Sequence, residues 1–291
     1  MAKKLLTALM LSMFITSGCA LAADIDLGEG YHVPASFDRI LITSSDGTAI
    51  QNAIDHIQNG GVVSLSGDFS LKHCIEIKKN ITLKGVDNAR AVLDRGAKVR
   101  GNKGVIWCEY KGDGDIILEN LTITGGNGAF GGGVFAVEGR VTITSCDINN
   151  NRALFGGGGI GVGIDVSVFT AESCDVSSND ATIGGGIFFN TRKHRTTQIK
   201  DCNIINNHAS GNILVFGTGG GLAVLESPLS ADNCVIINNS ADVSGGGVFI
   251  RGEETKLTTI SCDITTGNKA PQSADISIQG GASWQDLKDV N

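Results

Sequence analysis

The stretch that decides the fold is CDVSSNDATIGGGIF at residues 174–188. It contains a cysteine, an apolar residue two positions later, an asparagine five positions later, an alanine seven positions later, and three glycines that lead into apolar residues. Copies of this pattern begin at five cysteines separated by 28, 28, 32 and 28 residues: Cys146, Cys174, Cys202, Cys234 and Cys262. A fixed period of this size indicates a repeat architecture.

The residues around each cysteine repeat in register. The apolar residues are Ile148, Val176, Ile204 and Ile236, the asparagines are Asn151, Asn179, Asn207 and Asn239, and the alanines are Ala153, Ala181, Ala209 and Ala241. The fifth copy is shifted by one residue, to Asn268 and Ala270. Each unit consists of short runs that are rich in β-branched residues and broken by glycine and asparagine, which is typical of strands and not of helices.

Each repeat contains a corner between two strands, which is indicated by whether its apolar residues have odd or even numbers. Val141 and Ile143 share one parity, whereas Cys146 and Ile148 share the other. Because a strand alternates its faces strictly, this switch predicts a corner at Thr144–Ser145. We expect each repeat to form one coil of three short strands, named here glycine-led, pre-cysteine and cysteine-led. The predicted fold is all-β: a single-stranded right-handed parallel β-helix with about 28 residues per coil.

Stacked coils place equivalent residues about 4.8 Å apart, so the repeated side chains should form ladders along the axis. We expect the cysteines to form an inward ladder of small apolar residues, a role that buried free cysteine fills well. Disulfides between some of them are the alternative, and no CxxC or Cys/His spacing favours a metal site. The asparagines should bond to the turn backbones of neighbouring coils and adopt the left-handed conformations that corners need.

A short helix is predicted before the first coil. Ile50, Ile54 and Ile57 recur at helical spacing after Asp46, a residue suited to a helix start, and Gly60–Gly61 ends the segment. Such a helix would cover the open end of the first coil, whose unpaired strand edges would otherwise invite aggregation.

The N-terminus predicts export. Lys3–Lys4, an apolar run up to Ile15 and small residues ending at Ala22 form a secretory signal with an Ala-x-Ala cleavage site. Cys19 also resembles the cysteine of a lipoprotein cleavage box, which would add a lipid anchor. The predicted organisation is a signal peptide at 1–22, a lead-in at 23–45, the β-helix at 46–280 and a tail at 281–291.

The hydropathy of the sequence bears on where the protein is located, and its charge bears on which partners it binds. No later apolar run approaches the roughly 20 residues of a membrane span, so we expect a secreted, periplasmic or outer-surface protein. Removal of the signal takes away two lysines and changes the formal charge from −7 to −9. Such an acidic balance argues against nucleic acid as a partner.

Two resemblances to known families support the β-helix. The predicted helix together with Gly60–Leu65 and Lys79–Gly85 resembles the opening of the pectin-lyase-like superfamily. The Gly-Gly-Gly-Ile/Val-Phe blocks and the Cys-x-Ile-x-x-Asn-x-Ala units look like the repeats of polymorphic outer membrane proteins, bacterial surface proteins that resemble adhesins. The resemblances cover about residues 46 to 280 and imply fold more than function, because one β-helix hosts many activities. Such surface proteins carry a translocating barrel in addition to their repeats. The repeats here run almost to Asn291 and leave no room for one, so autotransport is not expected.

The leading functional hypothesis is an adhesin-like binding or structural module. Enzymes of the pectin-lyase-like superfamily typically carry their catalytic groups on the outward face of one strand column. If the residue after each glycine block points inward, the outward row is Phe135, Gly161, Phe188, Ala223 and Phe249. This row has no acid, lysine or arginine. Phe135, Phe188 and Phe249 would instead offer an apolar stripe to a cell-surface glycan or protein, unless longer loops cover the rings.

The alternative is a polysaccharide lyase or glycoside hydrolase acting on acidic polysaccharides, with Ca²⁺ as the cofactor of the lyase chemistry. The candidates for holding substrate carboxylates are Arg192, Lys193, His194 and Arg195, the dense basic cluster of the mature chain. A charged loop of this kind is usually a solvated turn. Asp113 and Asp115 would suit Ca²⁺, yet a glycine-rich turn explains them equally well. Enzyme activity is therefore the less favoured hypothesis, and no catalytic residue is assigned.

Overall fold

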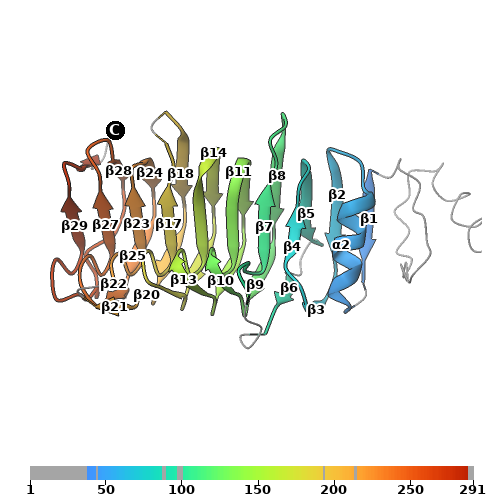
Figure 1. Ribbon diagram of the computed structural model, residues 1–291, viewed down its shortest axis with the longest axis horizontal. Coiled ribbons are helices and arrows are strands. Elements are labelled where there is room, and N and C mark those ends of the chain that lie inside the picture. The colour runs from blue at the N-terminus through green and yellow to red at the C-terminus, as the bar shows by residue number, and fades with distance from the viewer. Residues whose placement is uncertain are drawn as a thin grey trace, which may run out of the picture.

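The computed structural model describes residues 38–43, 45–86, 90–96, 101–192, 194–212 and 215–287. These residues form a parallel β-solenoid whose coils stack along one long axis (Figure 1). The predicted all-β fold with coils of 28 residues is confirmed, because the register pairs Ile148 with Val176 and Val176 with Ile204. The predicted signal peptide and Cys19 lie outside the described residues.

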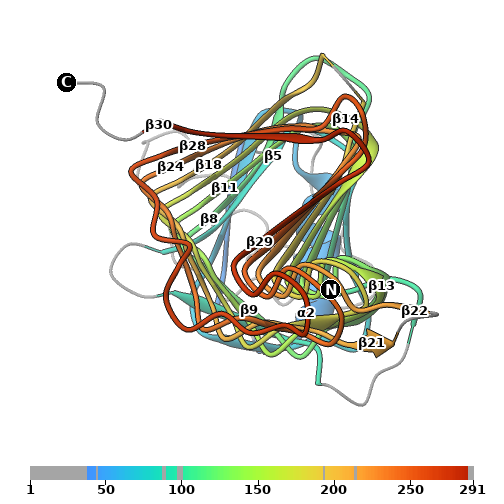
Figure 2. The ribbon, with the colours of Figure 1, turned by 90° about the vertical axis from the view of Figure 1, so that its left-hand side faces the viewer.

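Equivalent strands of successive coils form columns, and Figure 2 looks along them. The glycine-led column consists of β4 (Ile75–Ile77), β7 (Ile106–Glu109), the first part of β11 (Val134–Thr144), the first part of β14 (Ile160–Glu172), β17 (Ile187–Asn190), β23 (Leu222–Leu225), β27 (Val248–Arg251) and β29 (Ile276–Gln279). The pre-cysteine column consists of β1 (Arg39–Ile42), β2 (Gly61–Leu65), β5 (Ile81–Gly85), β8 (Asp115–Glu119), the last parts of β11 and β14, β18 (Thr196–Lys200), β24 (Pro228–Asp232), β28 (Lys256–Ile260) and β30 (Ser283–Leu287). The cysteine-led column consists of β3 (Asp68–Ser70), β6 (Ala91–Asp94), β9 (Leu121–Thr124), β12 (Asp147–Asn149), β15 (Asp175–Ser177), β19 (Asn203–Ile205) and β25 (Val235–Ile237).

The glycine-led column has the register that the sequence predicts. Its inward row runs from Val134 through Ile160 to Ile187, each paired with the next and fully buried. Leu222 and Val248 continue this row. Burial of one such side chain stabilises the fold by about 1.5–3 kcal/mol, so the inward rows hold successive coils together.

The predicted corner is confirmed. Strand β11 ends at Thr144, and Ser145 has a left-handed φ of 54°. Its backbone N–H donates to the carbonyl oxygen of Glu172 in the next coil. The same left-handed conformation recurs at the equivalent position of other coils, at Asn120, Ser173, Asp201, Asn233 and Ser261. Small polar residues recur at this corner because Asn and Asp tolerate the left-handed region better than other side chains.

A fourth short strand in the central coils was not predicted. The arm column, between the cysteine-led and the glycine-led strands, consists of β10 (Asn127–Phe130), β13 (Arg152–Gly156), β16 (Asp180–Ala181), β20 (His208–Ala209) and β26 (Ser240–Ala241). These strands have two to five residues, too few for a period of two to be read. The 32-residue spacing after Cys202 belongs to the coil that carries an antiparallel hairpin of β21 (Gly211–Asn212) and β22 (Val215–Phe216).

The asparagine ladder is confirmed as a buried hydrogen-bonded column. The side-chain amide of Asn179 donates to the carbonyl oxygen of Ile148 at 2.8 Å, and its Oδ1 accepts from the backbone N–H of Asn151 at 2.9 Å. The expectation that these asparagines are themselves left-handed is wrong, because that conformation falls on the preceding residue, as at Ser178 with φ 56°. One left-handed residue is enough to turn the chain, and the asparagine that follows is then available to bond along the stack.

The cysteine ladder faces the core. Cys146, Cys174, Cys202 and Cys234 are buried, Cys262 is half-buried, and all five are free thiols. Burial raises the pKa of the Cys146 thiol to about 12 and also raises the pKa of Cys108. Desolvation disfavours the thiolate, so these side chains behave as small apolar residues at neutral pH.

The raised thiol pKa values predict a loss of stability in alkali. An unfolded cysteine ionises near pH 9, whereas folded Cys146 stays neutral to about pH 12, so only the unfolded state gains free energy from ionisation between these values. We expect the contribution of Cys146 to the free energy of unfolding to fall by up to about 1.4 kcal/mol per pH unit above pH 9. Urea unfolding on either side of pH 9 measures the slope. Cys146→Ala should have a shallower slope than the wild type, and equal slopes would contradict the assignment.

Helix α2 (Gly47–His56) lies at the N-terminal end, as predicted (Figure 1). The Asp46 carboxylate caps it by accepting the backbone N–H of Thr48 at 3.0 Å. Ile50 and Ile54 are buried on the side of the helix that contacts the first coil. The solenoid also includes two strands outside the predicted limits of 46–280, because β1 pairs with β2 and β30 pairs with β28.

Candidate functional site

The outward row of the glycine-led column bears the three predicted phenylalanines. Phe135 pairs in register with Trp107 of the preceding coil and with Gly161 of the next. Phe188 and Phe249 follow in the same row. The expectation of an exposed stripe is wrong for these two, because Phe188 is 6% exposed and Phe249 is 3% exposed.

The arm covers the two buried rings, which is the alternative that the sequence left open. Phe188 and Phe249 form a small apolar cluster with Ala223 outside the main core, and Phe130 and Ile183 pack against it. Phe130 ends arm strand β10, and Ile183 follows arm strand β16. In Figure 2 the arm lies beside the outward face of the glycine-led strands. The stripe is therefore mostly an internal contact between arm and column.

At the start of the arm the aromatic rings remain accessible. We define the aromatic patch as Trp107, Phe130, Phe135 and Phe155. Trp107 and Phe135 lie edge to face with ring centres 5.1 Å apart, and Phe130 stacks on Phe135 at 5.6 Å. Phe155 tilts against Phe130 at 5.3 Å and is 50% exposed, whereas the other three are half-buried. Rings at these separations support one another in favourable aromatic geometry, so the patch is a preformed surface.

Charged side chains adjoin the patch at Trp107. Glu76 lies opposite Trp107 in the register of β4 and β7. The Lys103 ammonium is 4.6 Å from the centre of the Trp107 ring and 2.6 Å from the Glu76 carboxylate, while Trp107 Nε1 donates to Glu109 at 3.1 Å. Hydrogen bonds from Lys103 and Lys78 hold the pKa of Glu76 below its ordinary value. This carboxyl is therefore ionised at neutral pH and is unsuited to act as a general acid.

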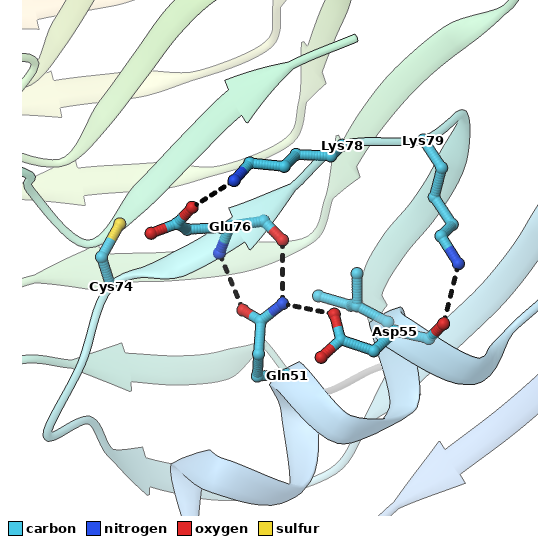
Figure 3. Close-up of a pocket in the computed structure, with 7 residues that line it drawn as sticks. Gln51, Asp55, Cys74, Glu76, Lys78 and Lys79 are labelled. Atoms are coloured by element: carbon cyan, nitrogen blue, oxygen red, sulfur yellow. Dashed lines mark hydrogen bonds and ion pairs between the residues drawn. The ribbon is translucent and has the colours of Figure 1, made fainter.

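A cavity of about 290 Å³ lies beside Glu76, between helix α2 and strand β4 (Figure 3). Gln51 reaches from the helix to the strand: its Oε1 accepts from the backbone N–H of Glu76 at 2.8 Å, and its Nε2 donates to the carbonyl oxygen of Glu76 at 3.0 Å. The side-chain amide thus pairs with the edge of β4 as a neighbouring strand would. Lys78 forms an ion pair with the Glu76 carboxylate at 2.8 Å.

The other groups of this pocket are also engaged. Lys79 donates to the carbonyl oxygens of Asp55 and Ile57 at 2.9 and 3.0 Å, at the end of helix α2, where a cation complements the helix dipole. Burial raises the pKa of the Cys74 thiol to about 12, so it is a poor nucleophile at neutral pH. The pocket therefore serves to attach the helix to the first coils.

The predicted basic cluster lies in the connection between β17 and β18. Arg192 is exposed and forms an ion pair with Asp165 at 3.2 Å. His194 is exposed with a left-handed φ of 70°, Arg195 is half-buried, and Lys193 lies outside the described residues. This connection follows the glycine-led strand, whereas the arm precedes it. The cluster and the aromatic patch therefore lie at opposite ends of the glycine-led strands.

Asp115, one of the two carboxylates considered for Ca²⁺, forms an ion pair with Arg140. Within the described ranges, no group of three or more His, Cys, Asp or Glu side chains is placed to hold a metal ion. The described part of the chain also has no helix with the length and apolar character needed to span a membrane.

Three members of the patch were missed from the sequence. Phe130 and Phe155 each stand directly before a glycine block, and this recurrent position could have identified them. Trp107 had no such signal, because its coil has the single Gly104 where later coils have three glycines. Its register with Phe135 therefore could not be read.

No protein-family model matches this chain, and no curated protein matches it either. The resemblances to pectin-lyase-like and polymorphic outer membrane proteins thus remain expectations from the sequence. The structure shows a parallel β-solenoid, a fold that does not by itself define a function.

Proposed function

We propose that this protein is an exported β-solenoid that binds a glycan chain through the aromatic patch. The observation that carries the proposal is the set of accessible aromatic rings that strands β7, β10, β11 and β13 hold on the outside of the solenoid. The apolar faces of sugar rings stack on such rings, and rigid strands present them with little ordering cost on binding. An apolar patch bordered by charged side chains is characteristic of an interaction site.

The charges around the patch favour a neutral glycan. The ammonium groups of Lys78 and Lys103 are already paired with Glu76, at 2.8 and 2.6 Å. The chain as a whole carries a formal charge of −7, which repels a polyanion. Glu109, whose Oε2 accepts from the Trp107 indole, offers its other carboxylate oxygen to sugar hydroxyls. A neutral polysaccharide therefore fits this surface better than a uronic-acid polymer does.

Binding to a panel of immobilised neutral and acidic polysaccharides tests the proposal. We expect Phe155→Ala to weaken binding about tenfold, because truncation of an aromatic side chain that contributes to binding costs about 1–2 kcal/mol. Leu154→Ala is the matched control, since Leu154 is the neighbour of Phe155 on β13, is 64% exposed and lies outside the patch. Both variants should keep the thermal stability of the wild type, because both side chains are exposed.

The same panel separates binding from catalysis. Unsaturated products seen by ultraviolet absorbance, or new reducing ends, would identify a lyase or a hydrolase and would replace the binding proposal by the enzyme alternative. Equal loss of binding in the Phe155 and Leu154 variants would also contradict it, as would folded wild-type protein that binds none of the polymers.

The proposal of export rests on the predicted signal at residues 1–22. N-terminal sequencing of the protein recovered outside the cytoplasm checks it, with Ala23 as the expected first residue. Recovery of a lipid-modified Cys19 would place the protein on a membrane surface instead.

A further inference from the structure

The last coil among the described residues presents core positions to solvent. In the last coil Ile278 pairs in register with Ile250, and Trp284 pairs with Leu257. Ile250 and Leu257 are fully buried, whereas Ile278 is 48% exposed and Trp284 is 39% exposed. Figure 2 looks onto this end, with β29 and β30 nearest the viewer. The last coil thus exposes side chains that a further coil would turn into core.

The backbone at this end has a free edge as well. Strand β29 pairs with β27 and β30 pairs with β28, and no strand among the described residues pairs with their other edges. Free N–H and C=O groups on such an edge are a template for another strand, and proteins usually protect them with charged residues or proline. The sequences ISIQ and SWQDL of these strands contain one charged side chain, Asp286. Its carboxylate accepts a hydrogen bond from Thr259 at 2.9 Å.

We propose that two copies of this protein associate end to end through their last coils, with β30 of one copy antiparallel to β30 of the other. A second copy supplies a coil edge of the same cross-section, and a two-fold axis makes the contact closed and self-complementary. The opposite end differs, because helix α2 packs against strands β1, β2 and β4 there. The contact is independent of glycan binding, since the aromatic patch lies on coils near the middle of the solenoid.

The charges of β30 suit this pairing. An antiparallel register centred on Gln285 sets Ser283 opposite Leu287 and Trp284 opposite Asp286. No like charges then face each other across the two strands, which would be unfavourable. The indole of Trp284 and the side chain of Ile278 are covered by the second copy, which removes apolar surface from water.

Sedimentation of the full-length protein over a range of concentrations tests the association. We expect a dimer for the wild type, and a double variant Ile278→Glu with Trp284→Glu should associate at least about 100-fold more weakly, because unpaired charges are costly in an interface. Leu154→Glu is the control: it places one such charge at an exposed apolar position on β13 and should dimerise as the wild type does. Circular dichroism verifies that all three proteins are folded. A monomeric wild type, or a dimer that the double variant leaves unchanged, overturns the proposal.

Two cysteine variants test the two-fold register. Residue 285 lies on the two-fold axis, so the Gln285→Cys thiols of the two copies would be adjacent. Mild oxidation should therefore give a covalent dimer. Ser283→Cys is the control, because its two copies would lie about 13 Å apart along the strands, beyond the reach of a disulfide. The wild type under the same oxidation gives the background from native cysteines. Cross-linking at position 283 as readily as at 285, or at neither position, overturns the arrangement.

Discussion

Replacement of Asn207 by alanine is expected to lower the free energy of unfolding by about 4 kcal/mol. The Oδ1 atom of Asn207 accepts from the backbone N–H and from the side chain of Asn179, at 3.0 and 3.1 Å. Its Nδ2 donates to the carbonyl oxygen of Val176 at 2.9 Å and to Oδ1 of Asn239 at 3.1 Å. Alanine would remove the acceptor of the buried backbone N–H of Asn179, at about 1–3 kcal/mol, together with two side-chain bonds along the ladder, and would add a cavity.

Asn206→Gly is the matched control for this prediction. Asn206 is the adjacent residue, is exposed and has a left-handed φ of 58°. Glycine adopts this conformation freely, so we expect a change of less than about 0.5 kcal/mol. Urea unfolding followed by circular dichroism compares the wild type with both variants. A cost for Asn207→Ala as small as that for Asn206→Gly would show that the ladder does not stabilise the stack.

Gly185→Ala is expected to cost at least about 4 kcal/mol or to prevent folding. A Cβ atom at this position would lie 2.6 Å from the carbonyl oxygen of Gly220, and closer still to the carbonyl oxygen of His208. Both are backbone atoms, so relief would require separation of strands. Because side-chain overpacking alone costs about 1–3 kcal/mol, a clash with backbone should exceed that range. His208 belongs to arm strand β20, so the glycine is what allows the arm to lie against the column.

Gly60→Ala is the control, because it measures the cost of a left-handed backbone conformation without a steric clash of the Cβ atom. Gly60 has a φ of 81°, and a Cβ atom there would meet nothing within 4 Å. Its replacement should cost only the backbone strain of about 1–2 kcal/mol. Soluble yield and the midpoint of thermal unfolding compare the two variants. If Gly185→Ala proves no more destabilising than Gly60→Ala, the glycine block does not set the distance between arm and column.

Much of the fold could be predicted from the sequence, because equivalent residues of a solenoid contact each other one coil apart. The five cysteines gave the period, and the inward row through Val134 and Ile160 followed from the glycine blocks. The parity switch near Ser145 located a corner that the structure confirms. The arm strands were missed, since their residues carry no readable alternation.

The candidate site was only partly predictable. The sequence placed Phe135 correctly in an outward row, yet it could not show that Phe130 and Phe155 lie beside it. These rings come from the arm, whose fold onto the column depends on backbone contact at the glycine blocks and not on a side-chain pattern. The basic cluster around Arg192 is a separate feature of the opposite end of the strands.

The sequence by itself determined the repeat, the coil length, the inward rows and the capping helix, because each of these is a periodic or local property of the chain. Only the tertiary structure decided which apolar side chains meet solvent. Phe188 and Phe249 are outward yet buried, because the arm covers them, whereas Ile278 and Trp284 occupy core positions yet are exposed. The physical reason is that periodicity fixes the direction of a side chain, while its burial requires that another segment lie on top of it.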